Sequence, residues 1–391
     1  MAVLVVNSGS SSIKFEIIDP ENGACSTRGL VERIGNSMGH YLLYFEEKKL
    51  SLYEPIPSHE HGMERILELI DELSPNLEEL NITAVGHRVV QGGKYFDKAV
   101  LIDDTVERHI QELIPLAPLH NPAHLRGIHI ARKLLPVPHV AVFDTAFFRH
   151  LPPESAYYAL NTEIAEKYEI LRYGAHGTSH QYAADKVCRM LGRRDLKQII
   201  FHLGNGASAS AVVGDKAVDT SMGLTPLEGL VMGTRTGDID PAVAFHLQRV
   251  AGMSSVEVDE LFNRRSGMKG LTGDSDMRVI WKRAQAGEEI CQRALQIYIH
   301  RILHYVGAYT AVMGGLDTIT FTAGIGEKDD LLRAAVLDRL ASFGIRYSAE
   351  LNAEKSKEAR TISTEDSKVQ VLVVPAHEEL AIARQVMEVI S

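Results

Sequence analysis

Two turns rich in glycine and serine could hold a phosphate chain. They are residues 7–12 (NSGSSS) and 202–208 (HLGNGAS), and each links two apolar runs. Backbone N–H groups and hydroxyls in such turns can form a concave surface that suits phosphate oxygens. Lys14 adds a cation after the first turn, while Gly204 and Gly206 allow close backbone approach in the second. One such turn alone is as consistent with an ordinary hairpin, but two matched turns favour phosphate binding.

A third glycine-containing segment, residues 322–327 (TAGIGE), follows an apolar run and precedes a helical pattern from Asp329. This order fits a nucleotide-binding loop at a helix N-terminus. It is not a complete GxGxxG, and the sequence contains no GxxxxGK[ST] loop. Phosphate contacts are therefore expected from several loops together.

Charged side chains stand at positions where an α/β sheet builds its sites. Arg88 interrupts an apolar run beside glycines, and Asp144 directly follows the run at residues 140–143. Arg235 lies in a turn of glycines and threonines, close to Asp238. For both arginines, the alternative to an anion-binding role is an ion pair with one buried neighbour.

His176 and His180 are four residues apart, as zinc ligands on a helix would be. Gly177 interrupts the helix, however, and no glutamate follows His176 as in HExxH. A donor to phosphate is the favoured role of His176. Thr178 and Ser179 are expected to cap or turn into the next helix.

These segments lie in an alternation of short β-branched runs and longer helical patterns, which is typical of α/β proteins. The predicted strands are residues 3–6, 15–18, 85–90, 140–143, 199–202, 318–322 and 369–374. The predicted amphipathic helices are residues 60–73, 104–114, 122–135, 178–192, 241–250, 286–313, 329–343 and 376–390.

A weak internal repeat relates the two glycine- and serine-rich turns. Residues 3–18 and 199–213 share the plan of strand, small polar turn and strand, with Asn7 in the place of His202. Two such hairpins about 195 residues apart suggest duplication of one domain. A chance match of two similar turns is the alternative.

The composition sets limits on the function. The length of 391 residues predicts two or three domains, and 45% hydrophobic residues allow a real core. The net charge of −10, spread along the chain, disfavours nucleic acid as a partner. Three scattered cysteines without a CxxC pair argue against disulfides or a cysteine-rich zinc site. With neither a signal-peptide pattern nor a run of roughly 18 apolar residues, we expect a cytoplasmic protein without a membrane partner.

Taken together, these segments resemble the acetate kinases and their short-chain acyl kinase relatives, in the superfamily of actin, sugar kinases and heat-shock-70 ATPases. The similarity runs in order through VNSGSSSIKF, GHRVVQGG, LAPLHNPAHLRGI, VAVFDTAFF, RYGAHGTSH, HLGNGAS, DTSMGLTPLEGLVMGTRTGDIDP, TAGIGE and VPAHEELAIAR. The resemblance implies an α/β fold of two duplicated ribonuclease H-like (actin-like ATPase) domains with a nucleotide cleft between them. It implies an acyl kinase domain of residues 1–148 plus the helix 376–391, and a nucleotide-binding domain of residues 149–375.

The resemblance implies reversible phosphorylation of acetate by Mg-ATP, giving an acyl phosphate and ADP by in-line transfer, in a homodimer. A carboxylate is already an anionic nucleophile. The barrier therefore lies in bringing negative groups together and in stabilising the transferring phosphoryl group. By the same resemblance, Arg88 and Arg235 flank the carboxylate and this phosphoryl group. His176 stabilises the transition state, while Asp144 orients an arginine and the metal shell.

The remaining site residues are also implied by the resemblance. Asn7 and Glu378 hold Mg²⁺ (or Mn²⁺), directly or through water. The residues that match ATP contacts are Lys14, His202, Leu203, Gly204, Asn205, Gly206, Asp276, Met277, Arg278, Gly324, Ile325, Gly326, Glu327 and Lys328. The acyl pocket comprises Arg88, Val90, Leu119, Ala175 and Pro226.

Three departures from the family pattern bear on the substrate and the metal. Ala175 stands where acetate kinases usually carry phenylalanine, and an additional buried methylene contributes about 0.8 kcal/mol. We therefore predict that propionate is also used well. Lys328 replaces the usual asparagine after GIGE, and Ala376 and His377 replace the usual Thr-Asn or Thr-Asp before Glu378. No effect is assigned to these two changes.

Two alternatives remain open. Within the enzymes, the chain could be a propionate or butyrate kinase. From another class, it could be an actin-like, ATP-dependent conformational switch. A switch does not require two arginines at a carboxylate site, and a chaperone would carry a long peptide-binding extension that is absent from this sequence.

Overall fold

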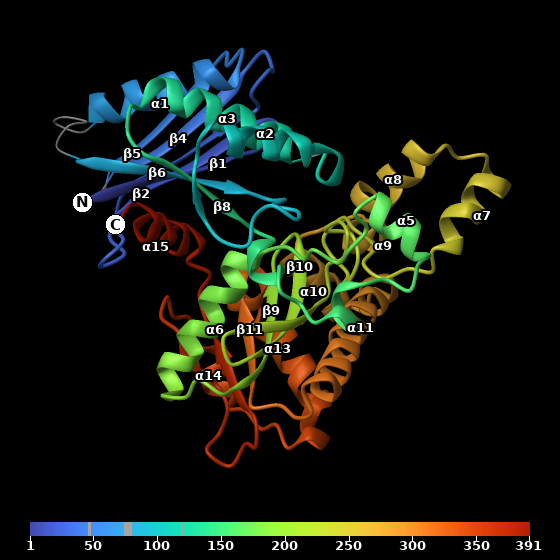
Figure 1. The fold of residues 1–391 in the computed structure, drawn as a ribbon. Coiled ribbons are helices and arrows are strands. Elements are labelled where there is room, and N and C mark those ends of the chain that lie inside the picture. The colour runs from blue at the N-terminus through green and yellow to red at the C-terminus, as the bar shows by residue number, and fades with distance from the viewer. Residues whose placement is uncertain (46–47, 74–79, 119) are drawn as a thin grey trace. The chain divides into compact units, whose positions relative to one another are not determined.

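The computed structural model describes residues 1–45, 48–73, 80–118 and 120–391 (Figure 1). The chain forms two compact units. The first comprises Met1–Arg149 and His377–Ser391, and the second comprises His150–Ala376.

The first unit is built on an eight-stranded sheet in the order β5-β4-β3-β2-β1-β6-β8-β7. Its strands are β1 (Ala2–Ser8), β2 (Ser12–Ile18), β3 (Cys25–Glu32), β4 (Gly39–Phe45), β5 (Lys48–Glu54), β6 (Ile82–Val89), β7 (Val100–Leu101) and β8 (His139–Phe143). Strand β1 pairs antiparallel with β2 and parallel with β6, and β6 pairs parallel with β8. The helices are α1 (His59–Leu73), α2 (Asp104–Glu112), α3 (Asn121–Leu134) and α15 (Glu378–Ile390), with 3₁₀ turns at Ile114–Leu116 and Ala146–Phe148.

Strand β1 is buried on both faces, which explains its continuous apolar sequence. Leu4 and Val6 share an apolar cluster with Ile66 of α1. Val3 and Val5, which point the other way, join the cluster that contains residues of α15. Strands covered by helices on both sides read as unbroken apolar runs rather than as alternating patterns. The C-terminal helix α15 thus completes the core of the unit that the N-terminus begins.

The second unit repeats the same arrangement in a six-stranded sheet of order β11-β10-β9-β12-β14-β13. Its strands are β9 (Lys197–Leu203), β10 (Ala207–Val213), β11 (Lys216–Thr220), β12 (Thr318–Thr322), β13 (Arg360–Thr361) and β14 (Gln370–Val373). Strand β9 pairs antiparallel with β10 and parallel with β12, which pairs parallel with β14. The order β3-β2-β1-β6-β8 therefore recurs as β11-β10-β9-β12-β14. The predicted duplication is confirmed, and Asn7 and His202 both lie one residue before the end of the matching strand.

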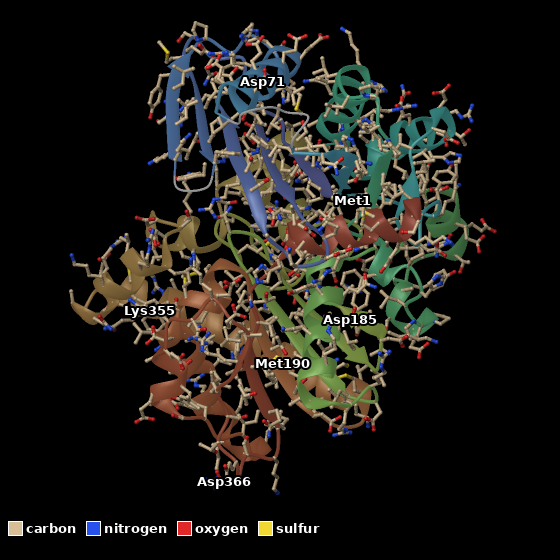
Figure 2. All side chains as sticks on the ribbon, turned by 90° about the vertical axis from the view of Figure 1, so that its left-hand side faces the viewer. Met1, Asp71, Asp185, Met190, Lys355 and Asp366 are labelled. Carbon is tan, nitrogen blue, oxygen red and sulfur yellow. The ribbon has the colours of Figure 1, made fainter. Side chains whose placement is uncertain are left out.

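The helices of the second unit surround this sheet. They are α4 (Pro153–Ala156), α5 (Thr162–Lys167), α6 (Gly177–Leu191), α7 (Ala242–Ala251), α8 (Ser255–Arg264), α9 (Gly267–Thr272), α10 (Met277–Gln285), α11 (Glu289–Met313), α12 (Ala323–Lys328), α13 (Asp330–Leu337) and α14 (Ala349–Ala353), with a 3₁₀ helix at Asp338–Phe343. Helix α6 shows the amphipathic pattern well, because Val187 is buried whereas Asp185 and Met190 lie on its exposed side (Figure 2). The predicted helix at 286–313 begins only at Glu289, since Gly287 at a φ of 94° separates it from α10. No helix in the described parts of the chain is long and apolar enough to cross a membrane.

Candidate active site

In the first unit, three predicted site residues lie together at the carboxyl ends of parallel strands. Asn7 is near the end of β1, Arg88 near the end of β6, and Asp144 directly after β8. The register places them at one edge, because Val6 pairs with His87 and Arg88 pairs with Val142. This sheet edge is where the loops and helix ends of an α/β unit form a site.

Arg88 and Asp144 form a bidentate ion pair. Arg88 Nε donates to Asp144 Oδ1 at 3.0 Å, and Nη2 donates to Oδ2 at 2.7 Å. Burial opposes the charge on Arg88, but the facing Asp144 carboxylate raises the pKa of Arg88 above its ordinary value. Asp144 is only 2% exposed, so the pair fixes the guanidinium plane. This is the geometry that an orienting role for Asp144 requires.

Glu378 brings another carboxylate to the same edge. It is the first residue of α15, which packs against β1, β6 and β8. Burial raises the pKa of Glu378; the charge of Arg88 lowers it, and the charge of Asp144 adds to the rise. The Glu378 carboxylate and the Asn7 carboxamide offer oxygen donors of the kind that Mg²⁺ prefers. Within the described residues, no group of three or more His, Cys, Asp or Glu side chains could hold a metal ion.

Lys14 lies opposite Asn7 in the β1–β2 hairpin. Its ammonium group contacts Glu379 closely and lies 3.5 Å from Glu16. Burial disfavours the charge of Lys14, but these carboxylates raise its pKa overall. The cation expected for a phosphate is therefore balanced by carboxylates in this structure.

In the second unit, His176 and Arg235 both lie against the Gly206 turn. A Cβ added to Gly206 would lie 3.5 Å from His176 Cε1 and 3.6 Å from Arg235 Nη1. His176 precedes α6 in a left-handed conformation at a φ of 58°, and its ring stacks on His202 with centroids 4.2 Å apart. The structure thus brings two predicted catalytic residues together beside a predicted phosphate turn.

Arg235 is a half-buried cation that none of the described carboxylates neutralises. Its Nη1 donates to the Pro226 carbonyl oxygen at 3.1 Å, and none of the described carboxylates lies within ion-pair distance. Burial lowers the pKa of Arg235. The alternative of a buried ion pair, which Arg88 does form, therefore does not apply to Arg235. A partly desolvated guanidinium without a carboxylate is suited to bind an anionic ligand.

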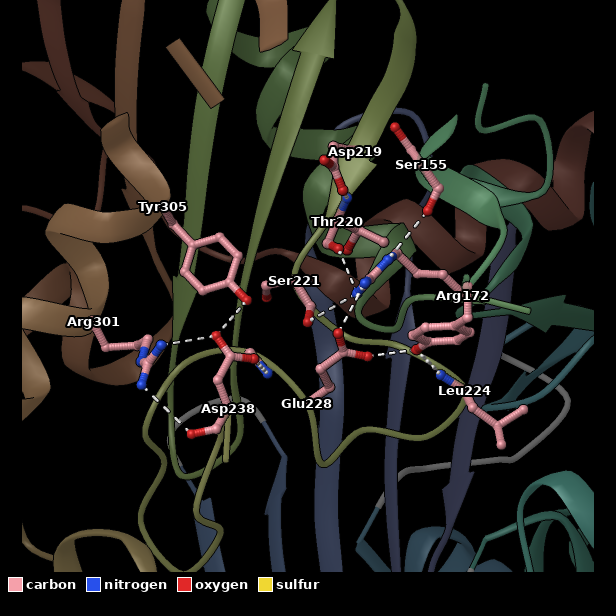
Figure 3. Close-up of polar contacts among 12 residues, drawn as sticks. Ser155, Arg172, Asp219, Thr220, Ser221, Leu224, Glu228, Asp238, Arg301 and Tyr305 are labelled. Atoms are coloured by element: carbon pink, nitrogen blue, oxygen red, sulfur yellow. Dashed lines mark hydrogen bonds and ion pairs between the residues drawn. The ribbon is translucent and has the colours of Figure 1, made fainter. Parts of the chain in front are cut away.

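A second set of residues, not expected from the sequence, secures the loop that carries Pro226 and Arg235 (Figure 3). Arg172 Nη2 donates to Glu228 Oε1 at 2.8 Å, and the Tyr158 hydroxyl donates to the other oxygen of Glu228. Burial disfavours the charge of Arg172, but the Glu228 carboxylate favours it. The pKa of Arg172 is therefore raised overall. A Cβ on Gly223 would lie 1.9 Å from both Tyr158 and Glu228, so only glycine fits there.

The far end of this loop is held by Asp238. Its Oδ1 accepts the Gly229 N–H at 2.8 Å, while Oδ2 accepts from Arg301 at 3.2 Å and from the Tyr305 hydroxyl at 2.9 Å (Figure 3). Arg301 and Tyr305 belong to α11. In the sequence, these anchors are indicated only by charged residues within glycine-rich turns. Their pairing cannot be predicted, because the partners are far apart along the chain.

A cavity of about 600 Å³ in the second unit is lined by half of the residues predicted for the nucleotide. The predicted residues that line it are Asn205, Asp276, Met277, Arg278, Gly324, Ile325 and Lys328. Trp281, Lys282 and Gln285 line it too and were not expected. Trp281 donates to Asp329 Oδ2 at 2.9 Å. An aromatic face beside lysines and helix ends gives surfaces for a base and for phosphates.

Arg278 and Asp276 form an exposed ion pair at the rim of this cavity. Side-chain and backbone hydrogen bonds from Arg278 lower the pKa of Asp276 to about 2. Asp276 also caps α10 through the Arg278 N–H.

The prediction of a loop at TAGIGE is wrong in one respect, because residues 323–328 form the short helix α12. Strand β12 passes directly into it through Ala323, at a φ of 65°. Arg333 of α13, only 1% exposed, donates to the Gly326 carbonyl at 2.8 Å and so secures this helix. Glu327 accepts the Ala376 N–H at 2.9 Å.

The predicted nucleotide residues that do not line the cavity are His202, Leu203, Gly204, Gly206, Gly326 and Glu327 in this unit, and Lys14 in the first.

The residues expected around the acyl group are divided between the units. Val90 of the first unit is 8% exposed, and its N–H donates to His124 Nδ1 at 3.2 Å. Ala175 of the second unit is 2% exposed and belongs to its apolar core. Leu119 lies outside the described residues.

Residues 2–384 match the acetokinase family. Acetate kinase of Corynebacterium aurimucosum is 50% identical over 389 residues, covering 98% of this chain and 96% of that protein. Acetate kinase of Streptomyces coelicolor is 49% identical, with coverage of 100% and 97%.

Two solved structures are also similar over the whole chain. Porphyromonas gingivalis acetate kinase superposes with a TM-score of 0.95 at 40% identity, with both chains covered completely. A propionate kinase from Francisella tularensis superposes with a TM-score of 0.94 at 38% identity, with 99% of each chain covered. The chain therefore belongs to the acetokinase family of phosphotransferases with a carboxyl group as acceptor.

Proposed function

We propose that this chain is an acetate kinase that transfers the γ-phosphoryl group of Mg-ATP to acetate, reversibly, and that it also accepts propionate. The observation that carries the proposal is the unneutralised, half-buried Arg235 beside His176 and the Gly206 turn. Similarity to acetate kinases at about 50% identity supports acetate as substrate.

In this proposal, the residues act on charge and position rather than on protons. The acceptor carboxylate needs no deprotonation, so a general base is unnecessary. Arg88, oriented by Asp144, and Arg235 bind the carboxylate and the phosphoryl oxygens by planar, charge-assisted contacts. His176 donates a hydrogen bond to a phosphoryl oxygen as charge spreads over it. The cavity at Asn205, Asp276 and Gly324 receives the nucleotide.

Asn7 and Glu378 are proposed to hold Mg²⁺, directly or through water. When bound, the ion would neutralise charge on the phosphate oxygens. The raised pKa of Glu378 supports this assignment, because a cation would relieve the unfavourable negative charge at this edge. Few protein ligands suffice, since Mg²⁺ keeps several waters.

The test measures ADP formation from Mg-ATP with acetate, propionate, butyrate or no acid. Acid-dependent turnover supports the kinase, and acid-independent slow hydrolysis would instead support a conformational switch. Arg235→Ala and Arg88→Ala should each lower kcat by about 10²-fold or more, with little change in KM for ATP. Arg346→Ala, which removes only an exposed ion pair with Asp366, is the matched control. Near-native turnover of either active-site variant would contradict these roles.

Propionate and butyrate kinase remain the second candidates. The buried methyl of Ala175 and the close similarity to a propionate kinase structure favour propionate over butyrate among these. The ratio of kcat/KM values across the three acids decides between them.

A homodimer is also proposed, in the cytoplasm. Helix α7 has no buried residue, and Phe245 and Val250 on it are 56% and 70% exposed. Apolar surface of this kind commonly marks an interface. The three cysteines are unpaired, which is consistent with a reducing compartment. Sedimentation of the wild type and of Phe245→Asp tests the assembly, since a dimer through this surface should dissociate in the variant.

A further inference from the structure

His176 and three neighbouring side chains form a continuous chain of alternating histidine and serine. His176 Nδ1 lies 2.9 Å from Ser208 Oγ, which lies 2.7 Å from His180 Nε2. His180 Nδ1 lies 2.8 Å from Ser210 Oγ. The two serines and His180 are not accessible to solvent, with 0% exposure. Their polar atoms must therefore satisfy one another.

The secondary structure explains this alternation. His176 and His180 are one helical turn apart where α6 begins, and Ser208 and Ser210 are two residues apart on one face of β10. A helical turn rises about 5.4 Å and two strand residues about 6.8 Å, so the two spacings nearly match. Each histidine ring can thus reach a serine, and each bond is of ordinary length.

The number of protons limits the chain to three orders. Burial, and then the neighbouring His202, keeps the pKa of His180 well below its ordinary value, so this ring is neutral and carries one N–H. In the first order, Ser210 donates to His180 Nδ1, His180 Nε2–H donates to Ser208, and Ser208 donates to His176 Nδ1. In the second order, every bond is reversed. The Ser210 proton then has no acceptor among the residues that the structure describes. In the third order, only the bond between His176 and Ser208 is reversed, so that Ser208 accepts from both histidines. The Ser208 proton then has no acceptor among the described residues.

Leaving a buried hydroxyl proton without an acceptor disfavours the second and the third order, each by about tenfold or more. In the first order His176 accepts at Nδ1, and its ring proton is therefore on Nε2. We infer that Ser208, His180 and Ser210 are positioning residues that keep His176 in the tautomer with its proton on Nε2. This inference rests on the proposed function, because in that reaction Nε2–H would be the donor to a phosphoryl oxygen.

The tautomer can be measured on the resting protein without any kinase assay. Protein with ¹⁵N-labelled histidine is examined by long-range ¹H–¹⁵N NMR near neutral pH, and His176→Gln identifies the His176 signals. The inference expects an unprotonated Nδ1 and a protonated Nε2 on both His176 and His180. A proton on Nδ1 of His176 as the main form would overturn it.

Ser208→Ala removes the central link. The inference expects comparable populations of the two His176 tautomers in this variant, and a kcat lowered about twofold or more, in proportion to the lost donor form. KM for ATP should not change. Ser363→Ala is the control, since it removes another buried serine hydroxyl, which bonds to Gln370 at 3.0 Å, in the same unit.

A purely structural role would lower the melting temperature of Ser208→Ala but leave the tautomer ratio as in the wild type, and that result would overturn the inference. The two proposals can fail separately. If the wild type forms no ADP in response to acid but shows the expected tautomer, the proposed function fails and the tautomer assignment stands.

Discussion

Arg172 and Glu228 are 56 residues apart in the chain, yet their side chains meet at 2.8 Å. The contact joins the segment that leads to His176 with the loop that carries Arg235. Arg172 also donates to the carbonyl oxygens of Ser155 and Thr220, both at 3.2 Å. The positions of His176 and Arg235 therefore depend on an ion pair between two residues that are far apart in the sequence.

Glu228→Ala should lower kcat by about tenfold or more, because a small displacement of Arg235 misplaces its contact with the phosphoryl group. KM for ATP should stay near the wild-type value, since Glu228 does not line the nucleotide cavity. Steady-state kinetics on the folded variant provide the measurement. Glu228→Gln keeps acceptor and donor atoms in place and should recover most of the loss. Equal kcat values for Glu228→Ala and the wild type would refute this positioning role.

Gly206→Ala should fold normally but turn over slowly. A methyl group there meets His176 and Arg235 at ordinary contact distances of 3.5 and 3.6 Å, so stability should change by less than about 1 kcal/mol. The same methyl occupies space beside both catalytic groups, and kcat should fall by about tenfold. The control is Gly307→Ala within α11, where no atom lies within 4 Å of the added Cβ. It should raise stability by about 0.5–1 kcal/mol and leave kcat unchanged.

Ala175→Phe should change the preference between acids. If Ala175 borders the acyl pocket, the larger ring removes the room for one methylene, worth about 0.8 kcal/mol. The ratio of kcat/KM for propionate to that for acetate should therefore fall about fourfold. Using a ratio within one variant cancels any loss of folded protein caused by the added volume. Ala175→Val should give a smaller fall, and an unchanged ratio in both variants would place Ala175 away from the acyl group.

Stability should decrease as the pH falls below about 6.5, because of buried histidines in the first unit. Burial, followed by the charges of Arg88 and His120, lowers the pKa of His124 from 6.5 to about 3. Between these values the unfolded chain binds a proton that folded His124 does not. The free energy of unfolding therefore falls by up to about 1.4 kcal/mol per pH unit. Burial lowers the pKa of His87 and His139 as well, so both add to the slope.

His124→Asn should reduce that slope. The asparagine oxygen can still accept the Val90 N–H, but it does not titrate. Urea unfolding at several pH values between 4 and 7 gives the slope for each protein. The control His246→Asn changes an exposed histidine on α7 and should leave the slope as in the wild type. If His124→Asn also leaves it unchanged, His124 is not the group that couples folding to protons.

The nucleotide region shows where local sequence is sufficient and where it is not. Asn205, Gly324 and Lys328 were predicted from the family pattern, and they line one cavity. Trp281 belongs to none of the segments that resemble the family, yet it lines the same cavity. TAGIGE was expected to be a loop, because it stands between an apolar run and a helical pattern that begins at Asp329. The buried Arg333 guanidinium donates a hydrogen bond to the Gly326 carbonyl oxygen and so stabilises α12. This tertiary contact cannot be predicted from the helix propensity of the segment.

The class of fold, the duplicated hairpins and most residues of the proposed site could be predicted from the amino-acid sequence. Periodicity, turn composition and motif order are properties of neighbouring residues. The surroundings of each charged group depend on the packed structure. Arg88 pairs with Asp144 and Arg172 with Glu228, whereas Arg235 has no carboxylate partner within the described part of the chain. The packed structure also aligns two histidines of α6 with two serines of β10. Burial and pairing depend on residues that meet only after the sheets and helices pack, so no local pattern can specify them.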